Sequence, residues 1–236
     1  SVAVPGEVAG FEYLLDNYGS DAVSRQQIFQ PAIDTANNGY VVGVTFKEEL
    51  DSEYTGIAAN ETLSNIYLDE SGLPYEVGDV IKNPDLAKTL QLIADGGKDA
   101  FYTGDMAQAM VDAVAAWGGN MTMEDLANYE VKVREPVVGH YKDYTIYSLP
   151  PASSGGTHLV EILNILENYD DMDKIGVNSA EYVHRFSEAF KIAFADRAQY
   201  MADTDFADVP LAQLTSKDYA AERYSEITDK SGSYVA

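Results

Sequence analysis

The feature that most constrains the fold is an abrupt change of pattern after residue 149. Residues 142–149 alternate between two faces, as expected of a β-strand. Pro150 and Pro151 end that strand, because proline lacks the N–H that a sheet ladder needs and fixes its own φ. Ser-Ser-Gly-Gly at residues 153–156 then opens a helix, whose apolar positions recur at helical spacing: Leu159, Val160, Ile162, Leu163 and Leu166.

Helical periodicity predicts a mostly helical chain around this motif. Helices are expected over residues 7–17, 26–37, 46–55, 58–66, 84–95, 106–117, 181–201, 211–214 and 219–227. Within the second helix, Pro31 is expected to break the helix or to start a new turn. The Gly96-Gly97 pair is expected to end the fifth, which leaves residues 98–103 as a connector.

Several helix starts carry capping residues. Asn83 and Ser179 fit the N-cap position, and Thr122 with Asp125 three residues later resembles a capping box. The helix over residues 181–201 is expected to bury one apolar face. That face consists of Val183, Phe186, Phe190, Ala193 and Phe194.

Residues 131–147 are the strand-rich part of the sequence. Val131 and Val133 alternate with charged residues, and two further runs at residues 137–138 and 144–147 favour a hairpin or a meander. The predicted fold class is therefore α+β, predominantly helical with a small strand cluster. No internal repeat or convincing boundary interrupts the sequence, so we expect a single domain over residues 1–236.

Composition excludes several classes of function. The 236 residues carry a net charge of −24, which argues against binding nucleic acid or an anionic membrane by bulk electrostatics. The absence of cysteine removes disulfides, thiolate metal sites and cysteine nucleophiles. No run of about 20 apolar residues predicts a membrane span. The sequence starts without the pattern of a signal peptide, as an excised piece would.

The serines at the start of the predicted helix are the first candidates for chemistry. A nucleophile elbow requires Gly-x-Ser-x-Gly between strand and helix, but no glycine precedes Ser153 or Ser154. The free N–H groups of a helix start could instead bind an anion. We favour a structural interpretation, in which the serines cap the helix and Gly155 and Gly156 allow close packing.

The three histidines do not form a metal-binding pattern. They are His140, His158 and His184. His158 and Glu161 lie at i and i+3 on the predicted helix, but no second histidine completes a metal triad. The sequence contains no phosphate-binding loop and no Gly-x-Gly-x-x-Gly, so we expect no metal and no cofactor.

Asp196 and Arg197 are the remaining candidates. Neighbouring residues on a helix do not face each other, so each is expected to make its own contact. We expect Arg197 to reach a carboxylate or carbonyl, Asp196 to reach backbone or a cation, and both to anchor structure. The 17 tyrosines are too scattered for a stacking platform. The residues alone therefore indicate no active site.

Short segments spread over nearly the whole chain resemble, in the same order, the γ-glutamyltransferase (γ-glutamyltranspeptidase) family. They are Val4-Pro5-Gly6-Glu7-Val8-Ala9-Gly10, Gln30-Pro31-Ala32-Ile33, Phe101-Tyr102-Thr103-Gly104, residues 118–126 (Gly-Gly-Asn-Met-Thr-Met-Glu-Asp-Leu), residues 150–156 (Pro-Pro-Ala-Ser-Ser-Gly-Gly), Phe194-Ala195-Asp196-Arg197 and Asp203-Thr204-Asp205-Phe206. Ordered similarity of this extent is more specific than any single motif.

The resemblance implies an N-terminal-nucleophile hydrolase. In that family a proenzyme cuts itself into a large and a small subunit, and the new N-terminal threonine is activated by its own α-amine. The enzyme transfers a γ-glutamyl group from glutathione or a similar donor to water or an amine. The implied fold is a four-layer αββα sandwich of both subunits, and the implied location is periplasmic, secreted or on the cell surface.

This chain resembles the later two-thirds of the large subunit. It lacks the Thr-Thr-His-Phe/Tyr-Ser motif of the cleavage site, and we expect it to end just short of that motif. It also starts after the Arg-Glu-x-Ala-Pro-like motif that holds the substrate carboxylate, and Arg134-Glu135-Pro136 is a different segment. No catalytic, substrate-binding or metal-binding residue can therefore be assigned, and we predict that the chain alone is inactive.

Three alternatives stay open. The chain could belong to a relative that acts on poly-γ-glutamate or on a β-lactam side-chain amide. It could be a non-catalytic, large-subunit-like binding or scaffold module. The third alternative, an unrelated acidic helical domain, is disfavoured by the ordered matches. The expected partners are the small subunit and a γ-glutamyl substrate, with no nucleic acid and no membrane insertion.

Overall fold

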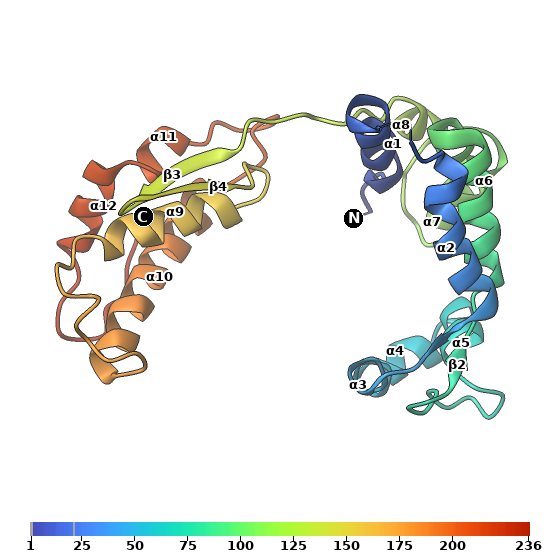
Figure 1. Ribbon diagram of the computed structural model, residues 1–236, viewed down its shortest axis with the longest axis horizontal. Coiled ribbons are helices and arrows are strands. Elements are labelled where there is room, and N and C mark those ends of the chain that lie inside the picture. Colours follow the sequence, from blue (N-terminus) through green and yellow to red (C-terminus); the bar gives the residue numbers. More distant parts are fainter. Residues whose placement is uncertain (1, 21) are drawn as a thin grey trace. The chain divides into compact units, whose positions relative to one another are not determined.

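The computed structural model describes residues 2–20 and 22–236 and divides into two compact units (Figure 1). One unit extends to Lys132 and the other begins at Val133. The described chain is predominantly helical with two short antiparallel sheets, which confirms the predicted α+β class. The single domain expected over residues 1–236 stays a prediction, since one domain can contain two such units.

The first unit consists of eight helices and two short strands among its described residues. They are α1 (Glu7–Tyr18), α2 (Arg25–Asn38), β1 (Tyr40–Val41), α3 (Val44–Ser52), α4 (Tyr54–Ala58), α5 (Glu61–Tyr67), β2 (Val80–Ile81), α6 (Pro84–Tyr102), α7 (Gly104–Ala116) and α8 (Met123–Ala127). The strand β1 pairs with β2, with Tyr40 opposite Ile81.

The helix α2 continues through Pro31, so the predicted break is wrong. An internal proline costs a helix about 3 kcal/mol, because one backbone hydrogen bond is lost and the ring crowds the preceding turn. Ile33 and Ala36 of α2 pack against Ala87 and Ala94 of α6. Burial of this face stabilises the helix more than the local signal suggested.

The helix α6 shows what the Gly96-Gly97 pair does. Asn83 accepts a hydrogen bond from the Leu86 N–H, as predicted for an N-cap. Gly97 has a φ of 63° and a ψ of −154°, which kinks the helix at the predicted stop. A Cβ atom there would lie 3.1 Å from both the Arg25 and the Glu12 side chains. Residues 98–102 are helical beyond the kink, so the predicted connector is wrong.

The family-like turn at residues 4–6 is held by Tyr102, at the end of α6. The Tyr102 hydroxyl donates to the Pro5 carbonyl at 2.6 Å and accepts from the Ala9 N–H at 3.2 Å. Its ring stacks on Tyr129 with the centroids 5.6 Å apart. The short helix α8 begins at the capping box that the sequence predicts, with Thr122 and Asp125 bonded reciprocally. The hydrogen bonds of Tyr102 fix how the chain enters α1.

The second unit contains a hairpin and four helices among its described residues. They are β3 (Val137–Tyr141), β4 (Tyr144–Ser148), α9 (Gly155–Leu166), α10 (Ala180–Tyr200), α11 (Leu211–Leu214) and α12 (Lys217–Tyr224). The register runs from Val137 opposite Ser148 to Tyr141 opposite Tyr144, which confirms the predicted hairpin. Lys142 takes a φ of 51° in the turn, and its N–H donates to Glu167 at 2.6 Å.

The strand expected around Val131 and Val133 is absent from the described chain, where residues 128–136 are irregular. Val131 packs against the apolar cluster of the first unit, whereas Val133 is 65% exposed. The alternation of apolar and charged residues is therefore present although only one of these two valines packs against a core. A strand also needs a neighbouring strand to which its backbone can hydrogen-bond, and the alternating pattern carries no information about such a neighbour.

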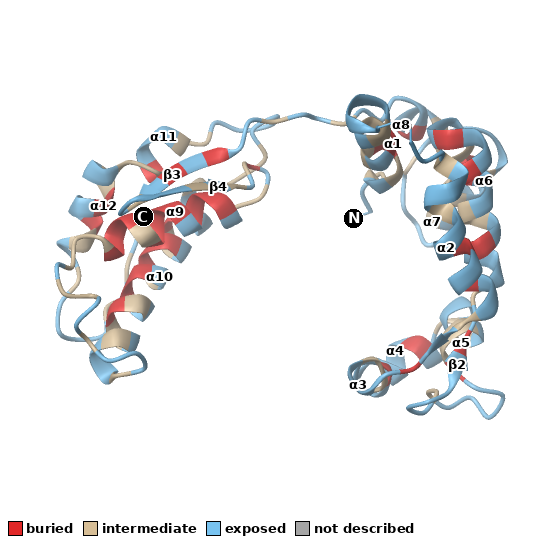
Figure 2. Ribbon diagram, in the orientation of Figure 1, coloured by how far each residue is buried: buried red, intermediate tan, exposed pale blue. Residues whose placement is uncertain are grey.

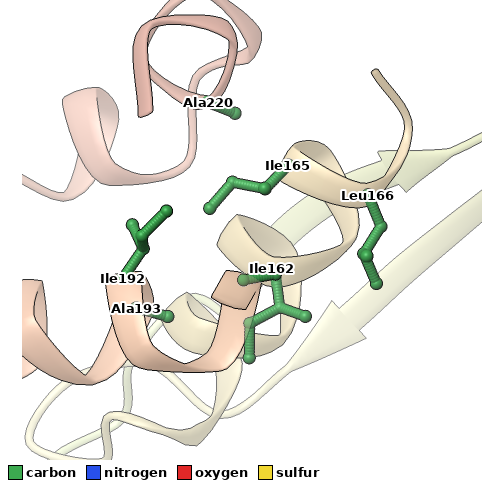
Figure 3. Close-up of a cluster of buried hydrophobic side chains, with 7 residues drawn as sticks. Ile162, Ile165, Leu166, Ile192, Ala193 and Ala220 are labelled. Atoms are coloured by element: carbon green, nitrogen blue, oxygen red, sulfur yellow. The ribbon is translucent and has the colours of Figure 1, made fainter. Parts of the chain in front are cut away.

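The core of the second unit lies between α9, α10 and α12 (Figure 3). Ile162 and Ile165 of α9 face Ile192 and Ala193 of α10, and Ala220 of α12 closes the cluster. Buried residues are concentrated on α9 (Figure 2).

The face of α10 that the sequence predicted is largely wrong. Val183 is 51% exposed and Phe194 is 55% exposed. The buried residues of this helix are Arg185, Glu188, Ala189, Ile192, Ala193 and Asp196. The small residues let α10 pack closely against its neighbours, and the buried charged residues form hydrogen bonds or ion pairs. A count of apolar residues along the sequence captures neither effect.

Candidate functional site

The turn that starts α9 places the candidate serines beside α10. Ser153 Oγ accepts a hydrogen bond from the Gly155 N–H at 3.3 Å. Ser154 stands at the N-cap position without a side-chain capping bond. Its hydroxyl instead accepts from Arg197 Nε at 3.1 Å. Capping is therefore wrong for Ser154, which links α9 to α10.

Gly156 confirms the close packing that the sequence favoured. A Cβ atom at this position would lie 3.0 Å from Ser148 Cβ and would also meet the Leu149 carbonyl. The end of β4 can approach α9 this closely only because glycine has no side chain.

Among the described residues, neither serine hydroxyl is hydrogen-bonded to a group that could act as its base. A serine nucleophile needs a group that can take its proton. The partner of Ser154 is a guanidinium, which offers only donors and does not deprotonate in proteins. The arrangement is therefore that of a structural contact. Anion binding at this helix start stays a prediction.

The three histidines lie apart. His140 Nδ1 is 3.4 Å from Thr145 Oγ1 within the hairpin, and His184 Nε2 is 2.7 Å from the Thr228 carbonyl. His158 is buried and stacks on Phe194, with ring centroids 5.8 Å apart and planes inclined by 11°. Burial, followed by the positive charge of Arg197, lowers the pKa of His158. A neutral ring in the core is the result.

Asp196 and Arg197 diverge as neighbouring helical residues should. Asp196 is fully buried, accepts from the Tyr219 hydroxyl at 2.9 Å and pairs with Arg223 at 3.3 Å. The predicted cation partner is thus confirmed. Arg197 points away to Ser154, a hydroxyl, so the carboxylate or carbonyl expected for it is wrong.

Glu161 completes a buried acid pair that the sequence analysis missed. Its carboxyl group contacts Asp196 in the core between α9 and α10, and both residues have no exposed surface. Burial, followed by the hydrogen bond and the charge of Asp196, raises the pKa of Glu161 to about 9. Glu161 is therefore protonated at neutral pH, so that the buried acid pair carries a single negative charge.

One signal could have revealed Glu161. It stands between Val160 and Ile162, within the apolar run of α9. A carboxyl group in such a run is either paired or protonated, because an isolated buried charge is too costly. The helical spacing indicates Glu161 only as a possible metal ligand beside His158. Among the described residues, no three His, Cys, Asp or Glu side chains converge as a metal site would require.

Comparisons with known proteins agree with the fold. A family model described as Gamma-glutamyltranspeptidase matches residues 1–235. The chain is 41% identical over 216 residues to the glutathione hydrolase proenzyme of Escherichia coli (strain K12), covering 92% of this chain and 37% of that protein. It is 40% identical over 223 residues to the acylase ACY 1 proenzyme of Pseudomonas sp. (strain SE83), covering 94% and 39%.

A solved structure supports the same grouping. The crystal structure of Helicobacter pylori gamma-glutamyltranspeptidase superposes with a TM-score of 0.90 at 39% identity, covering 96% of this chain and 64% of that chain. The chain belongs to the gamma-glutamyltranspeptidase family, a family of enzymes. The resemblance indicated by the sequence is thereby confirmed.

The matched region is only part of the known relatives. The chain spans 37% of the Escherichia coli relative and 39% of the Pseudomonas relative. Among the described residues, no helix combines the length and the hydrophobicity that crossing a membrane requires.

Proposed function

We propose that this chain is part of the large subunit of an enzyme that transfers or hydrolyses γ-glutamyl groups. The observation that carries the proposal is the family match over residues 1–235, combined with coverage of only 37% of the Escherichia coli proenzyme. The chemistry then depends on residues outside this chain. Among the described residues, the serines lack a base and the Glu161 carboxyl is buried, so residues 150–200 fit a role in stabilising the fold.

The proposed reaction uses an N-terminal threonine released by cleavage of a proenzyme. Its hydroxyl attacks the γ-glutamyl carbonyl of glutathione or a similar donor, while its own α-amine takes the proton. The donor amine leaves with that proton, and a γ-glutamyl ester remains on the threonine. Water or an acceptor amine then attacks the ester, which yields free glutamate or a new γ-glutamyl amide and restores the hydroxyl.

We propose the small subunit of the same proenzyme as the partner of this chain, in an αββα sandwich. An unpartnered apolar surface in the first unit supports this. Phe11 is 52% exposed, Leu14 55%, Tyr18 73% and Ile28 50%. They line a groove of about 540 Å³ between α1, α2 and α6. Contiguous apolar surface of this kind is usually covered in a complete protein.

Expression of the full open reading frame tests the proposal. The protein is followed over hours on a denaturing gel, and the N-terminus of any new band is sequenced. Two bands, the smaller beginning with threonine, together with release of amine from a γ-glutamyl anilide, are expected. Residues 1–236 expressed alone should release none. A single uncut and inactive product would favour the binding or scaffold module instead.

The acylase relative supports one second candidate. Its identity to this chain, 40%, is nearly that of the glutathione hydrolase relative, 41%. The processed enzyme would then cleave a β-lactam side-chain amide in preference to a γ-glutamyl amide. The ratio of kcat/KM for the two substrates, with poly-γ-glutamate as a third, separates these specificities.

We infer a periplasmic, secreted or cell-surface location from the family resemblance. Fractionation of cells that express the full open reading frame tests the location. Recovery of processed enzyme only from the cytosol would refute it.

A further inference from the structure

The tail of the chain is anchored to one buried carboxylate on α10. The Glu188 side chain is 1% exposed. Its Oε2 accepts from the Gly232 N–H at 2.9 Å and from the Tyr234 hydroxyl at 2.6 Å. Its Oε1 accepts from Lys191 Nζ at 2.7 Å. One side chain thus holds two points of the tail.

Further contacts fix the same segment. Lys191 Nζ also donates to Ser231 Oγ at 2.7 Å and to the Gly232 carbonyl at 3.2 Å. The Tyr234 ring packs against the core cluster of α9, α10 and α12. Upstream, the Thr228 carbonyl lies 2.7 Å from His184 Nε2. We name residues 228–234 the tail segment, and every one of these contacts joins it to α10 or to the core.

Glu188 is ionised, which strengthens its hydrogen bonds to the tail segment. Burial alone would raise its pKa, but the hydrogen bonds from Lys191, Tyr234 and Gly232 outweigh burial and lower the pKa to about 2. Burial, followed by the bond to Glu188, raises the pKa of Tyr234, so the phenol keeps its proton and remains a donor. Hydrogen bonds to an ionised acceptor are roughly twice as strong as neutral ones.

We propose that Glu188 is a positioning residue for cleavage of the proenzyme. By fixing the tail segment, it holds in a defined place the start of the chain segment that contains the cleaved peptide bond. This inference rests on the proposed function and on the family resemblance, in which the cleavage motif follows this region of the large subunit. An intramolecular attack is fast only while the reacting groups stay close and aligned. A released tail samples many conformations, and few of them are competent.

Two variants of the full-length protein test this inference. Tyr234→Phe removes one hydrogen bond and keeps the ring, and Glu188→Gln removes the charge and keeps the shape. Tyr147→Phe is the matched control, because this tyrosine is 70% exposed in β4 and its hydroxyl makes no hydrogen bond among the described residues. Cell-free synthesis followed by denaturing gels gives the first-order constant for cleavage.

We expect cleavage about threefold slower for Tyr234→Phe and at least about tenfold slower for Glu188→Gln. The Tyr147→Phe control should cleave at the wild-type rate. Once processed, the Tyr234→Phe enzyme should show wild-type kcat and KM, which a general structural defect would not. Its Gly232 amide should exchange hydrogen faster than in the wild type, which reports release of the tail segment directly.

Two results overturn the inference in distinguishable ways. If the wild type is processed and both variants cleave at its rate, Glu188 does not position the tail, and the proposed function stands. If the wild type stays uncut, the proposed function fails and the positioning role fails with it. Should Glu188→Gln not fold, Tyr234→Phe still decides between these outcomes.

Discussion

Glu161 of α9 and Asp196 of α10 meet carboxyl to carboxyl in the core of the second unit, with neither residue exposed. Tyr219 donates to Asp196 at 2.9 Å and Arg223 lies 3.3 Å from it. Arg223 also binds Glu226 at 2.8 Å, so its charge is not given to the acid pair alone. The pair therefore keeps a proton that unfolding would release. The stability of this unit should therefore fall as pH rises from the ordinary pKa of a glutamate to the raised pKa of Glu161.

Glu161→Gln should remove that pH dependence. The pKa of Glu161 is about 9 in the folded chain, against 4.5 for an ordinary glutamate. Between these values the folded state binds the extra proton, so the free energy of unfolding falls as pH rises, by up to about 1.4 kcal/mol per pH unit. Glutamine stays neutral and can still donate to Asp196. We expect a melting temperature that falls from pH 6 to pH 9 in the wild type and changes much less in the variant.

Equal pH dependence in both proteins would contradict the shared proton. Glu124→Gln serves as a control, because Glu124 is exposed in the first turn of α8 and belongs to the other unit. Its melting curve should follow the wild type at both pH values.

Arg223→Met should be strongly destabilising. The side chain of Arg223 is 7% exposed and pairs with Asp196, which is fully buried. Removing one partner leaves an uncompensated buried charge, which costs about 3–5 kcal/mol. A lower urea midpoint for the second unit measures the loss. Lys88→Met removes an exposed pair with Asp85 and should leave the midpoint unchanged.

If Arg223→Met unfolds at the wild-type midpoint, the guanidinium does not stabilise the acid pair. The double variant Arg223→Met with Asp196→Asn should recover part of the lost stability, because the unpaired carboxylate is then gone.

The structures that the sequence predicted correctly are those set by neighbouring residues. The Thr122–Asp125 capping box, the Ser179 N-cap and the β3–β4 hairpin depend on short-range turn chemistry. The kink at Gly97 likewise follows from one residue that tolerates positive φ.

The features that the sequence did not predict depend on distant partners. Pro31 remains inside α2 because α6 covers the adjacent face. Glu188 is buried because Gly232 and Tyr234, more than 40 positions away, return to it. Glu161 needs Asp196 from another helix. The periodicity of apolar residues along the sequence carries no information about such contacts, so it predicts the wrong buried face for α10.

Gly156→Ala should destabilise the second unit by about 1–3 kcal/mol, because a methyl group would be forced against Ser148 and the Leu149 carbonyl. Gly176→Ala is the matched control, since nothing lies within 4 Å of a Cβ atom there. Differential scanning calorimetry should show a lower melting temperature for the first variant alone. Equal temperatures would mean that β4 can move away from α9 without loss.

Ser154→Ala tests whether the start of α9 takes part in chemistry. The Ser154 hydroxyl accepts one bond from Arg197 at 3.1 Å, and a guanidinium cannot take its proton. We therefore expect the full-length variant to be processed normally and to keep kcat/KM within about twofold, since losing a nucleophile costs orders of magnitude. Its stability should fall by about 1 kcal/mol or less, the usual worth of one hydrogen bond. A loss of activity of a hundredfold or more in a folded, processed variant would place the serine in the reaction and would contradict a catalytic centre outside this chain.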